Sequence, residues 1–345
     1  MSNTKRIRAR APLRLGLAGG GTDVAPYCDE YGGQVLNATI SMYAYATVET
    51  APPGQVIFRA TDLQKEEILA ADPDMPTEGP LSLHRGVYRR IVREFNHGRP
   101  LSIILTTHSD APAGSGLGSS STVIVSMVEA LKEFLMLPMG EYDVAHLAYR
   151  IERQDLGLQG GKQDQYAATF GGFNFMEFSA NDRVLVNPLR IRESTLAELE
   201  ATLVVYFTGV SRDSAAIIEE QTRNVVSGQS KALDAMHALK ADAERMKGHL
   251  LRGDLRGVAD ILGHSWRAKK KLSDMIASES IDRIYEQAIN AGAYAGKISG
   301  AGGGGFMMFM VDPTRRPEVC RALARETGAI HTVHFTSQGA IAWRC

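Results

Sequence analysis

The stretch PAGSGLGSSST at residues 112–122 places three glycines directly ahead of four hydroxyl residues, and the apolar stretch VIVSMVEALKEFLML follows it. A buried-type strand, LSIILTT, precedes it at 101–107. Main-chain N–H groups at the start of a helix lack partners within the helix, and the helix dipole adds positive charge there. A glycine-rich loop leading into that helix lets phosphate oxygens approach several of these groups at once. The pattern therefore predicts a strand, a phosphate-binding loop and a helix.

An ordinary strand-to-helix turn with a serine cap is the alternative, but three glycines exceed what such a turn needs. Ser119 or Ser120 is expected to cap the helix in either case, because serine is a favoured N-cap residue. The predicted phosphate-binding residues are Gly114, Ser115, Gly116, Leu117, Gly118, Ser119 and Ser120.

Two better-known phosphate loops do not match this chain. A Walker A loop reads G-x-x-x-x-G-K-[ST]; Gly296 and Lys297 come nearest, but Ile298 fills the hydroxyl position and Ala291 the first glycine position. Residues 114–118 read G-x-G-x-G rather than the G-x-G-x-x-G of dinucleotide-binding folds. A different type of phosphate loop is therefore required.

The composition limits the partners of such a site. The 345 residues include 38 basic and 39 acidic side chains, so the chain offers no charge excess to a nucleic acid or an anionic membrane. The cysteines Cys28, Cys320 and Cys345 lack C-x-x-C spacing, which argues against a disulfide scaffold or a zinc site. No apolar run of the signal-peptide or membrane-spanning kind occurs. We expect a soluble cytoplasmic protein without nucleic-acid or membrane partners, and the sequence leaves open whether it forms a homo-oligomer.

The hydrophobic pattern predicts strands and helices without strict alternation. In the first half, strands are expected near 6–17, 35–50, 55–61 and 101–107, and helices over 82–96, from the glycine loop to Pro138, and over 141–156. In the second half, from about residue 185, we expect a strand at 203–209, long helical patterns over 213–248 and 254–275, a helix at 280–291, two strands flanking the glycines of KISGAGGGGFMMFMV, a helix at 316–327 and closing strands over 330–344. This mixture favours two domains of the α+β class.

Three glycine-bearing motifs resemble, in order and spacing, those of the GHMP kinase superfamily, which includes galactokinase, homoserine kinase, mevalonate kinase and phosphomevalonate kinase. They are APLRLGLAGGGTD at 11–23, PAGSGLGSSS at 112–121 and KISGAGGGGF at 297–306. The resemblance implies an N-terminal domain over 1–184, like the second domain of ribosomal protein S5, with the phosphate loop and the catalytic aspartate. It implies a ferredoxin-like C-terminal domain over 185–345 with the glycine-rich motif. It also implies ATP as co-substrate, Mg²⁺, and a site in the cleft between the domains.

The same resemblance assigns two catalytic residues. Asp164, in GGKQDQYAATFGG, lies where many family members carry the aspartate that accepts or orients the proton of the acceptor hydroxyl. Arg14, in PLRLGL, corresponds to an arginine that flanks this aspartate and the transferred phosphate in the galactokinase branch. A surface aspartate and a surface salt bridge are the alternative interpretations.

Glu152 and Ser120 form the expected Mg²⁺ pair. Glu152 lies on the last turn of the 141–156 helix, about where similar family members place their magnesium-binding glutamate. One carboxylate and one hydroxyl, completed by phosphate and water oxygens, suit this ion. The alternative is a charge on a solvated helix face beside Arg150, Arg153 and Asp155.

The acceptor is expected at the first motif. Asp23 matches a sugar-binding aspartate of galactokinases, but Gly20 and Gly21 stand where that branch has an acidic residue and a histidine, which argues against galactose. The stretch GGGTDVAPYCDEYGGQVLNATI at 19–40 resembles the D-glycero-D-manno-heptose 7-phosphate kinases more closely. That resemblance implies phosphorylation of the anomeric hydroxyl to the 1,7-bisphosphate, toward nucleotide-activated heptose for surface polysaccharide. The alternatives are a fucokinase-like or other sugar 1-kinase, and a catalytically silent sugar or nucleotide sensor; balanced charge disfavours an RNA-binding module.

The 7-phosphate of such an acceptor would require cations. Arg85, Arg89 and Arg93 recur every four residues, a pattern more typical of a solvated helix face, whereas Arg212 and Lys297 adjoin loop motifs and are preferred. The glycines at 300–305 are expected to bring backbone close to the substrate or the phosphate loop. The expected acceptor-binding residues are Gly20, Gly21, Thr22, Asp23, Gly171, Gly172, Arg212, Lys297, Gly302 and Gly303.

Overall fold

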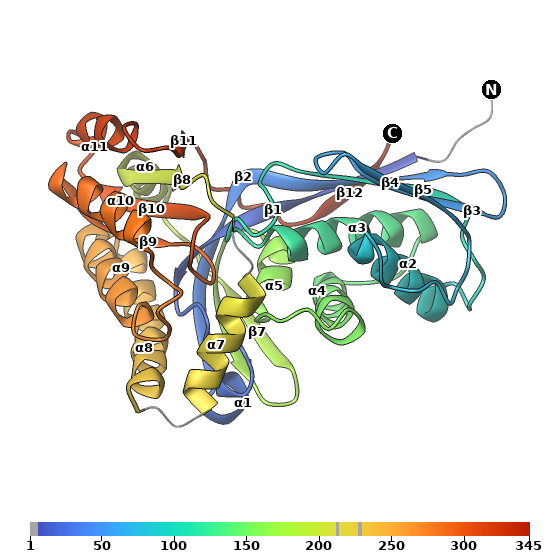
Figure 1. The fold of residues 1–345 in the computed structure, drawn as a ribbon, viewed down its shortest axis with the longest axis horizontal. Coiled ribbons are helices and arrows are strands. Elements are labelled where there is room, and N and C mark those ends of the chain that lie inside the picture. The colour runs from blue at the N-terminus through green and yellow to red at the C-terminus, as the bar shows by residue number, and fades with distance from the viewer. Residues whose placement is uncertain (1–5, 212–213, 227–229) are drawn as a thin grey trace.

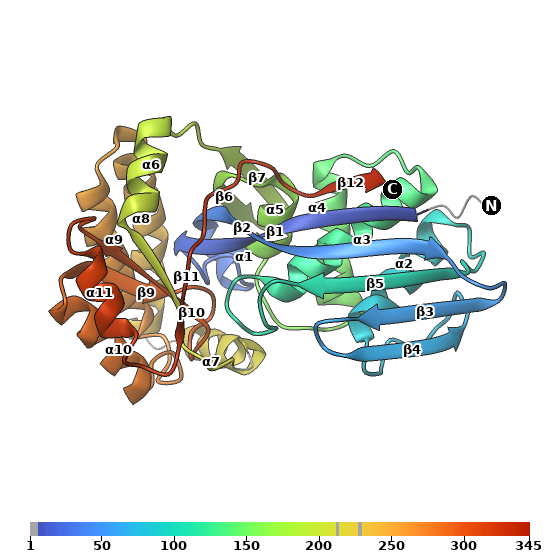
Figure 2. The same ribbon diagram turned by 90° about the horizontal axis from the view of Figure 1, so that it is seen from above.

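The protein is built on two β-sheets that lie side by side along an elongated molecule (Figure 1, Figure 2). The structure, a computed structural model, describes residues 6–211, 214–226 and 230–345. The larger sheet has eight strands and the smaller has four. Within the described part of the chain, no helix combines the length and the apolar character needed to cross a bilayer.

The larger sheet has the strand order β12-β1-β2-β5-β3-β4, and β6 and β7 continue it from the other half of β2. Its strands are β1 (Arg6–Ala18), β2 (Gly33–Thr50), β3 (Gln55–Ala60), β4 (Lys65–Ala70), β5 (Ile103–Ser109), β6 (Phe173–Ser179), β7 (Arg183–Pro188) and β12 (Ile341–Arg344). The long β2 pairs with β5 through residues 44–50 and with β6 through residues 33–38. All pairs are antiparallel except β3 with β5.

Helices α2 (Ser82–Phe95), α3 (Ser119–Leu135), α4 (Glu141–Arg150) and α5 (Gln163–Phe170) lie on one face of the larger sheet (Figure 1). The helix expected over 82–96 is confirmed, because Val87, Ile91 and Val92 fall on one side of α2 and are buried. The helix expected over 141–156 is correct in extent, but its last turn, η1 (Ile151–Asp155), widens into a π-helix before the chain turns at Gly157.

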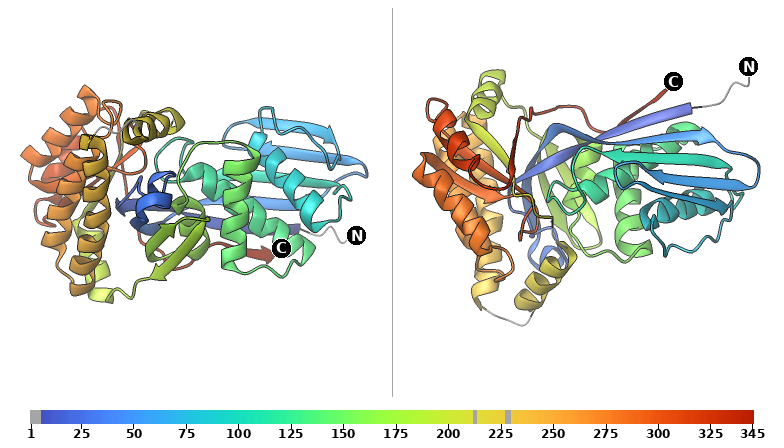
Figure 3. Two further views of the ribbon diagram at one scale, coloured as in Figure 1. Left: turned by 90° about the horizontal axis from the view of Figure 1, so that it is seen from below. Right: turned by 45° about the horizontal axis from the view of Figure 1, so that its top comes forward.

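The smaller sheet has the order β11-β8-β10-β9, and helices gather at its end of the molecule (Figure 3). Its elements are α6 (Glu193–Thr202), β8 (Leu203–Phe207), α7 (Ser214–Val226), α8 (Ser230–Arg252), α9 (Leu255–Lys269), α10 (Glu279–Asn290), β9 (Ala293–Ile298), β10 (Phe306–Val311), α11 (Arg316–Leu323) and β11 (Ala329–His331); the short α1 (Tyr27–Tyr31) follows β1. The pattern expected over 213–248 corresponds to α7 and α8, and residues 213 and 227–229 lie outside the described residues.

The closing strands expected over 330–344 belong to two different sheets. β11 pairs with β8 in the smaller sheet, whereas β12 pairs with β1 in the larger one. Between these two strands the chain forms hydrogen bonds with the first half of the sequence, since the N–H of Thr336 donates to the carbonyl of Thr39 at 3.1 Å. The first and the last strand of the described chain, β1 and β12, therefore lie side by side (Figure 2). The proposed domains are 1–184 and 185–345, although residues 185–188 complete strand β7 of the larger sheet and the C-terminal tail also returns to that sheet.

Candidate active site

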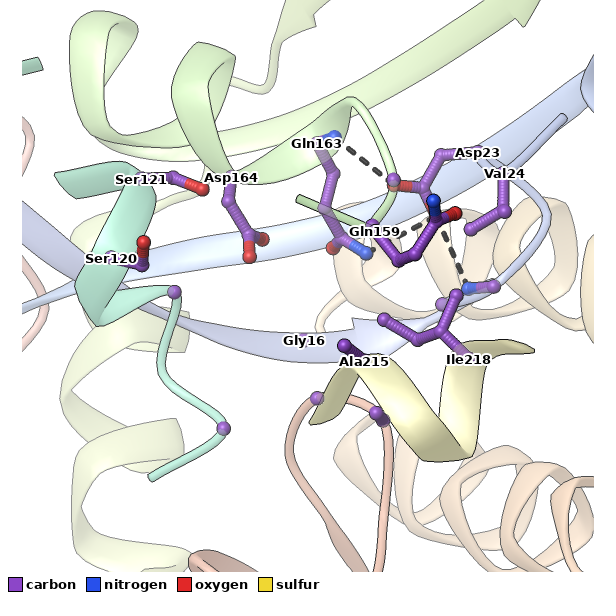
Figure 4. A pocket seen from close by; sticks show the side chains of 18 of the residues that line it. Gly16, Asp23, Val24, Ser120, Ser121, Gln159, Gln163, Asp164, Ala215 and Ile218 are labelled. Atoms are coloured by element: carbon purple, nitrogen blue, oxygen red, sulfur yellow. Dashed lines mark hydrogen bonds between the residues drawn. The ribbon is translucent and has the colours of Figure 1, made fainter. Parts of the chain in front are cut away.

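The three glycine motifs meet around one cavity of about 490 Å³ where the two sheets adjoin. Its walls come from β1 and the loop after it, the 113–121 segment, residues 158–164, α7, α9, and the segment from β9 to residue 301. In Figure 4, Asp164 and Gln163 lie between the serines that begin α3 and the side chain of Asp23. Segments that are far apart in the sequence thus form one site.

The phosphate loop has the left-handed backbone that glycine adopts without strain. Gly114, Gly116 and Gly118 have φ angles of +72°, +81° and +77°. Gly118 occupies the N-cap of α3, and among the described residues no side chain caps the amides of the first turn. The expected serine cap is therefore wrong, and Ser119 instead donates to the carbonyl of Pro112 at 3.2 Å. The main-chain N–H groups at the start of α3 remain available to an anion.

The glycine loop between β9 and β10 lies directly against the phosphate loop. A Cβ on Gly116 would come within 2.3 Å of the carbonyl oxygen of Ser299, and a Cβ on Gly305 would come within 2.1 Å of that of Ser115. The N–H of Phe306 donates to the same Ser115 carbonyl at 2.9 Å. This approach of two backbones explains why both loops are rich in glycine.

Asp164 and Arg14 form an ion pair beside the phosphate loop. Arg14 is buried in β1, and its Nε donates to Oδ1 of Asp164 at 2.7 Å. Its Nη1 donates to the carbonyl of Gly116 at 2.6 Å and to Oγ of Ser299 at 3.3 Å. The carboxylate carbon of Asp164 lies 3.1 Å from the position that a Cβ on Gly118 would occupy. One guanidinium therefore orients the carboxylate and joins it to both glycine loops.

Glu152 lies in η1 and is 2% exposed. Its Oε1 accepts from Ser120 Oγ at 2.8 Å, and its Oε2 accepts from Ser121 Oγ at 2.6 Å and from Gln165 Nε2 at 2.6 Å. The guanidinium of Arg153 lies 3.5 Å from Oε1. The expected Ser120–Glu152 pair is in contact, and Ser121 and Gln165 are additional partners that no sequence motif indicates.

The donor chemistry of Glu152 and Ser120 fits a magnesium ion. Both residues line the cavity and offer hard oxygen ligands. Across the described ranges, no three His, Cys, Asp or Glu side chains gather into a metal-binding cluster. The pair therefore suits an ion that takes its other ligands from phosphate and water.

The side of the cavity that was predicted to bind the acceptor contains Asp23, which is 1% exposed. Its carboxylate accepts from the N–H of Gly21 at 3.1 Å, from the N–H of Gln163 at 3.0 Å and from Gln163 Nε2 at 3.3 Å. Gly161 is required beside it, because a Cβ there would lie 1.9 Å from Asp23 Oδ2. Oε1 of Gln163 is buried and finds no hydrogen-bond partner among the described residues. A hydroxyl of a bound substrate would satisfy it.

Several predicted acceptor-binding residues lie outside the cavity wall. Gly172 donates its N–H to the carbonyl of Thr336 at 3.1 Å, and its neighbour Gly171 also contacts the C-terminal tail. Gly303 donates to the carbonyl of Ile276 at 2.8 Å, and Gly302 packs against the same residue. These four glycines therefore hold loops in place behind the cavity.

Thr22 likewise serves the fold. Its hydroxyl lies 2.8 Å from the carbonyl oxygen of Gly19 and accepts from the N–H of Gln34 at 3.0 Å. Gly20 and Gly21 do line the cavity. Arg212 lies outside the described residues. Among the arginines of α2, Arg85 is paired with Glu67 and Arg93 with Asp74, away from the site.

Two buried lysines line the cavity. Lys297 donates to the carbonyl of Gly16 at 2.6 Å, and Lys269, which was not predicted, donates to the carbonyl of Gly300. Burial lowers the pKa of Lys269 to about 8, and the charge of Arg14 adds to this effect. Burial also lowers the pKa of Lys297 well below its usual value, with the charges of Lys269 and Arg14 acting in the same direction.

Two family patterns match the chain: "GHMP kinases N terminal domain" over residues 82–172 and "GHMP kinases C terminal" over residues 235–330. The D-glycero-alpha-D-manno-heptose 7-phosphate kinase of Campylobacter jejuni is 51% identical over 340 residues, which cover 99% of each chain. The bifunctional fucokinase/GDP-fucose pyrophosphorylase of Arabidopsis thaliana is 25% identical over 93% of this chain and 31% of its own length.

A solved structure agrees with the sequence match. The crystal structure of a D-glycero-D-manno-heptose 1-phosphate kinase from Bacteroides thetaiotaomicron is 45% identical and superposes with a TM-score of 0.84 over 98% of this chain and 99% of its own. The expected two-domain α+β fold is thereby confirmed.

Proposed function

The chain belongs to the GHMP kinase family and is a sugar kinase, and from this premise we propose that it phosphorylates the anomeric hydroxyl of D-glycero-D-manno-heptose 7-phosphate with ATP, giving the 1,7-bisphosphate. The observation that carries the proposal is the position of Asp164. Its carboxylate lies beside Gly118 of the phosphate loop, is held by Arg14, and faces the cavity that Asp23 and Gln163 line. The full-length identity to a kinase of this name supports the choice of acceptor.

In the proposed reaction, the phosphates of ATP bind the main-chain N–H groups at 114–120. The anomeric oxygen bonds to the γ-phosphorus as the bond from that phosphorus to the bridging oxygen breaks, and ADP leaves with the electron pair. Asp164 orients the acceptor hydroxyl and receives its proton. Arg14 offsets the negative charge that develops on the transferred group, because its guanidinium is fixed between the carboxylate and the phosphate loop.

We propose that Ser120 and Glu152 hold the Mg²⁺ that accompanies the nucleotide. When bound there, the ion would neutralise phosphate charge and help to align the phosphates. Ser121 and Gln165 keep the Glu152 carboxylate in place, since each donates a hydrogen bond to its Oε2.

The acceptor is tested by turnover on heptose 7-phosphate, heptose 1-phosphate and unphosphorylated heptose, with phosphorus NMR locating the new ester. This comparison is needed because the names of the two similar kinases differ in the position of the acceptor's phosphate. We expect rapid turnover of the 7-phosphate and a new ester on C1. Preferential turnover of the 1-phosphate, with a new ester on C7, would contradict the proposed acceptor.

A fucokinase-like activity is the second candidate, supported by the similarity to a plant fucokinase. A panel of sugars assayed for ADP release separates the two, since a fucokinase needs no phosphate on its acceptor. A silent sensor is less compatible with the site, because Asp164 and Arg14 are both present and in contact.

We also propose that the protein is cytoplasmic. We further propose that its product is converted to nucleotide-activated heptose for surface polysaccharide. All three cysteines are free, as expected in a reducing compartment. Burial raises the pKa of Cys28 to about 12, so its thiol is unreactive at neutral pH.

A further inference from the structure

We propose that Lys269, with Lys297 beside it, binds the phosphate ester that the acceptor sugar already carries. This inference rests on the proposed function and deepens it, because it assigns the preference for a phosphorylated acceptor to a named residue of α9. The chemical class recognised is a sugar phosphomonoester, bound on the acceptor side of the cavity.

The charges that line the cavity are not balanced. Arg14 is paired with Asp164, and Arg153 lies beside Glu152. Lys269 and Lys297 are 3% and 4% exposed, yet neither has a carboxylate within 4.0 Å among the residues that the structure describes. A buried amine without a counter-ion loses its proton more readily, which is why the pKa values of both lysines are lowered, and an anionic ligand would stabilise the charged form.

The nearby carboxylates are occupied by other partners. Asp23, on the loop after β1, is held by Gly21 and Gln163. Asp242, on α8, raises the pKa of Lys297, but its own carboxylate accepts from Ser265 at 2.8 Å and contacts His264 Nδ1 at 2.8 Å. The charged groups facing Lys269 are therefore Arg14 from β1, Lys297 from β9 and Asp23, a set with more positive than negative charge.

When protonated, both lysine side chains also have N–H donors without a partner among the described residues. Each carries three N–H bonds. The structure gives each one hydrogen bond, from Lys269 to the carbonyl of Gly300 and from Lys297 to that of Gly16. These two carbonyl-bearing residues adjoin, since a Cβ on Gly16 would lie 4.0 Å from the N of Gly300 and 4.0 Å from the unpartnered Oε1 of Gln163. Free donors and a free acceptor thus converge at one place.

The orientation of α9 singles out Lys269 from its neighbours. A run of three lysines begins at the last residue of the helix, and Lys269 lies on the buried side of α9, together with Ser265 and Trp266. Lys270 pairs with Asp282 at 3.1 Å, and Lys271 is exposed. Lys271 therefore provides a matched control of the same charge and residue type.

The test compares Lys269→Met, Lys269→Arg and Lys271→Met with the wild type. Calorimetry in the presence of ADP measures the binding of heptose 7-phosphate and of the same heptose without phosphate. We expect Lys269→Met to weaken binding of the 7-phosphate by about 10- to 100-fold, the usual effect of losing a charged hydrogen bond. Binding of unphosphorylated heptose and of ADP should change by less than about twofold, and Lys269→Arg should retain most of the preference. Lys271→Met should match the wild type.

Two results would overturn the inference. Equally weakened binding of both sugars would place Lys269 at the reacting centre or in the framework of the fold. Unchanged binding of both sugars would show that Lys269 does not contact the phosphate. A thermal melt of the ligand-free Lys269→Met variant serves as the folding control. We expect no decrease in its melting temperature, because the substitution removes an uncompensated buried charge. If the melting temperature of Lys269→Met does decrease, Lys269→Arg still tests the inference, because it should retain the preference for the 7-phosphate. A wild type that shows no preference for the 7-phosphate would instead contradict the proposed acceptor, whatever Lys269 does.

Discussion

At the scale of single residues, this site depends on how each charged group is partnered. Arg14 and Asp164 hold each other in place, Glu152 receives three hydrogen bonds, and the two lysines have no acidic partner among the described residues. These differences separate the groups that we propose act in phosphoryl transfer from those that we propose bind the acceptor phosphate.

Replacing Asp164 with alanine should lower kcat by about 10³-fold, because proton transfer from the acceptor hydroxyl loses its acceptor. The affinity for ADP should stay within about threefold of the wild type, since the phosphate loop donates through its main chain. Steady-state kinetics and fluorescence titration with ADP measure the two quantities. Asp274→Asn, at an exposed position, is the control, and a near-normal rate for Asp164→Ala would rule out the assigned role.

Replacing Glu152 with glutamine should raise the Mg²⁺ concentration for half-maximal activity by at least about tenfold, because a charged oxygen ligand is lost. The effect of Mg²⁺ on ADP affinity should diminish in parallel, which provides a readout without turnover. Asp155 lies in the same π-helical turn but pairs with Arg90, so Asp155→Asn is the matched control. An unchanged Mg²⁺ dependence in Glu152→Gln would place the ion elsewhere.

The preference for the 7-phosphate should also depend on pH. Burial lowers the pKa of Lys269 to about 8, so the free enzyme loses this charge above that pH, while a phosphomonoester is a dianion above roughly pH 6. The ratio of kcat/KM for phosphorylated over unphosphorylated heptose should therefore be highest between these values and decrease above pH 8. In Lys269→Met the ratio should be low and flat. Besides burial, the charge of Arg14 lowers the pKa of Lys269 and the charge of Asp23 raises it, so these two groups help to set the midpoint.

At the scale of elements, the loop before α3 depends on close backbone approach as well as on backbone conformation. Gly116 has φ +81° and leaves no space for a Cβ, which would lie 2.3 Å from the Ser299 carbonyl oxygen. Gly54 has nearly the same conformation, φ +76°, but nothing lies within 4 Å of its Cβ position. Comparing substitutions at Gly116 and Gly54 therefore distinguishes the effect of backbone strain from the effect of the contact between the two loops.

Gly54→Ala should cost about 1 kcal/mol of stability through its left-handed backbone and leave ADP binding unchanged. Gly116→Ala should show a larger loss of stability and at least about a tenfold loss of ADP affinity, because the glycine loops must move apart and Arg14 bonds to both. Thermal melts and ADP titrations provide the comparison. Equal effects in the two variants would mean that the contact with Ser299 does not matter.

At the scale of the whole molecule, the C-terminal tail joins the two sheets. After β11 the chain leaves the smaller sheet, and β12 pairs with β1 through residues 341–344. This pairing covers the edge of β1, the strand whose far half carries Arg14. The position of Arg14 is therefore supported by residues at both ends of the chain.

Deleting residues 340–345 should lower the melting temperature by several degrees and promote self-association, because an uncovered strand edge offers unpaired N–H and carbonyl groups. Melting curves and size-exclusion chromatography test this. Cys345→Ser, which keeps β12 intact, is the control. A deletion variant that melts like the wild type and elutes unchanged would show that the tail contributes little.

Local sequence patterns determined much of this site. Two of the glycine motifs predicted the two close-packed loops, because close approach to main-chain N–H groups requires glycines near one another in the sequence. Asp164, Glu152 and Arg14 were identified through the resemblance to the kinase family, and the structure places all three in the wall of one cavity. The amphipathic pattern of α2 likewise located that helix to within a residue.

Other features were decided only by the tertiary structure. Which lysine of the run at 269–271 faces the cavity depends on how α9 packs, and the pKa of that lysine depends on its burial and on groups from β1 and the loop after it. The expected serine cap was wrong because Gly118, with positive φ, already ends the loop. The closing strands joined different sheets because pairing depends on which edge is free, a property of the assembled sheets and not of the strand itself.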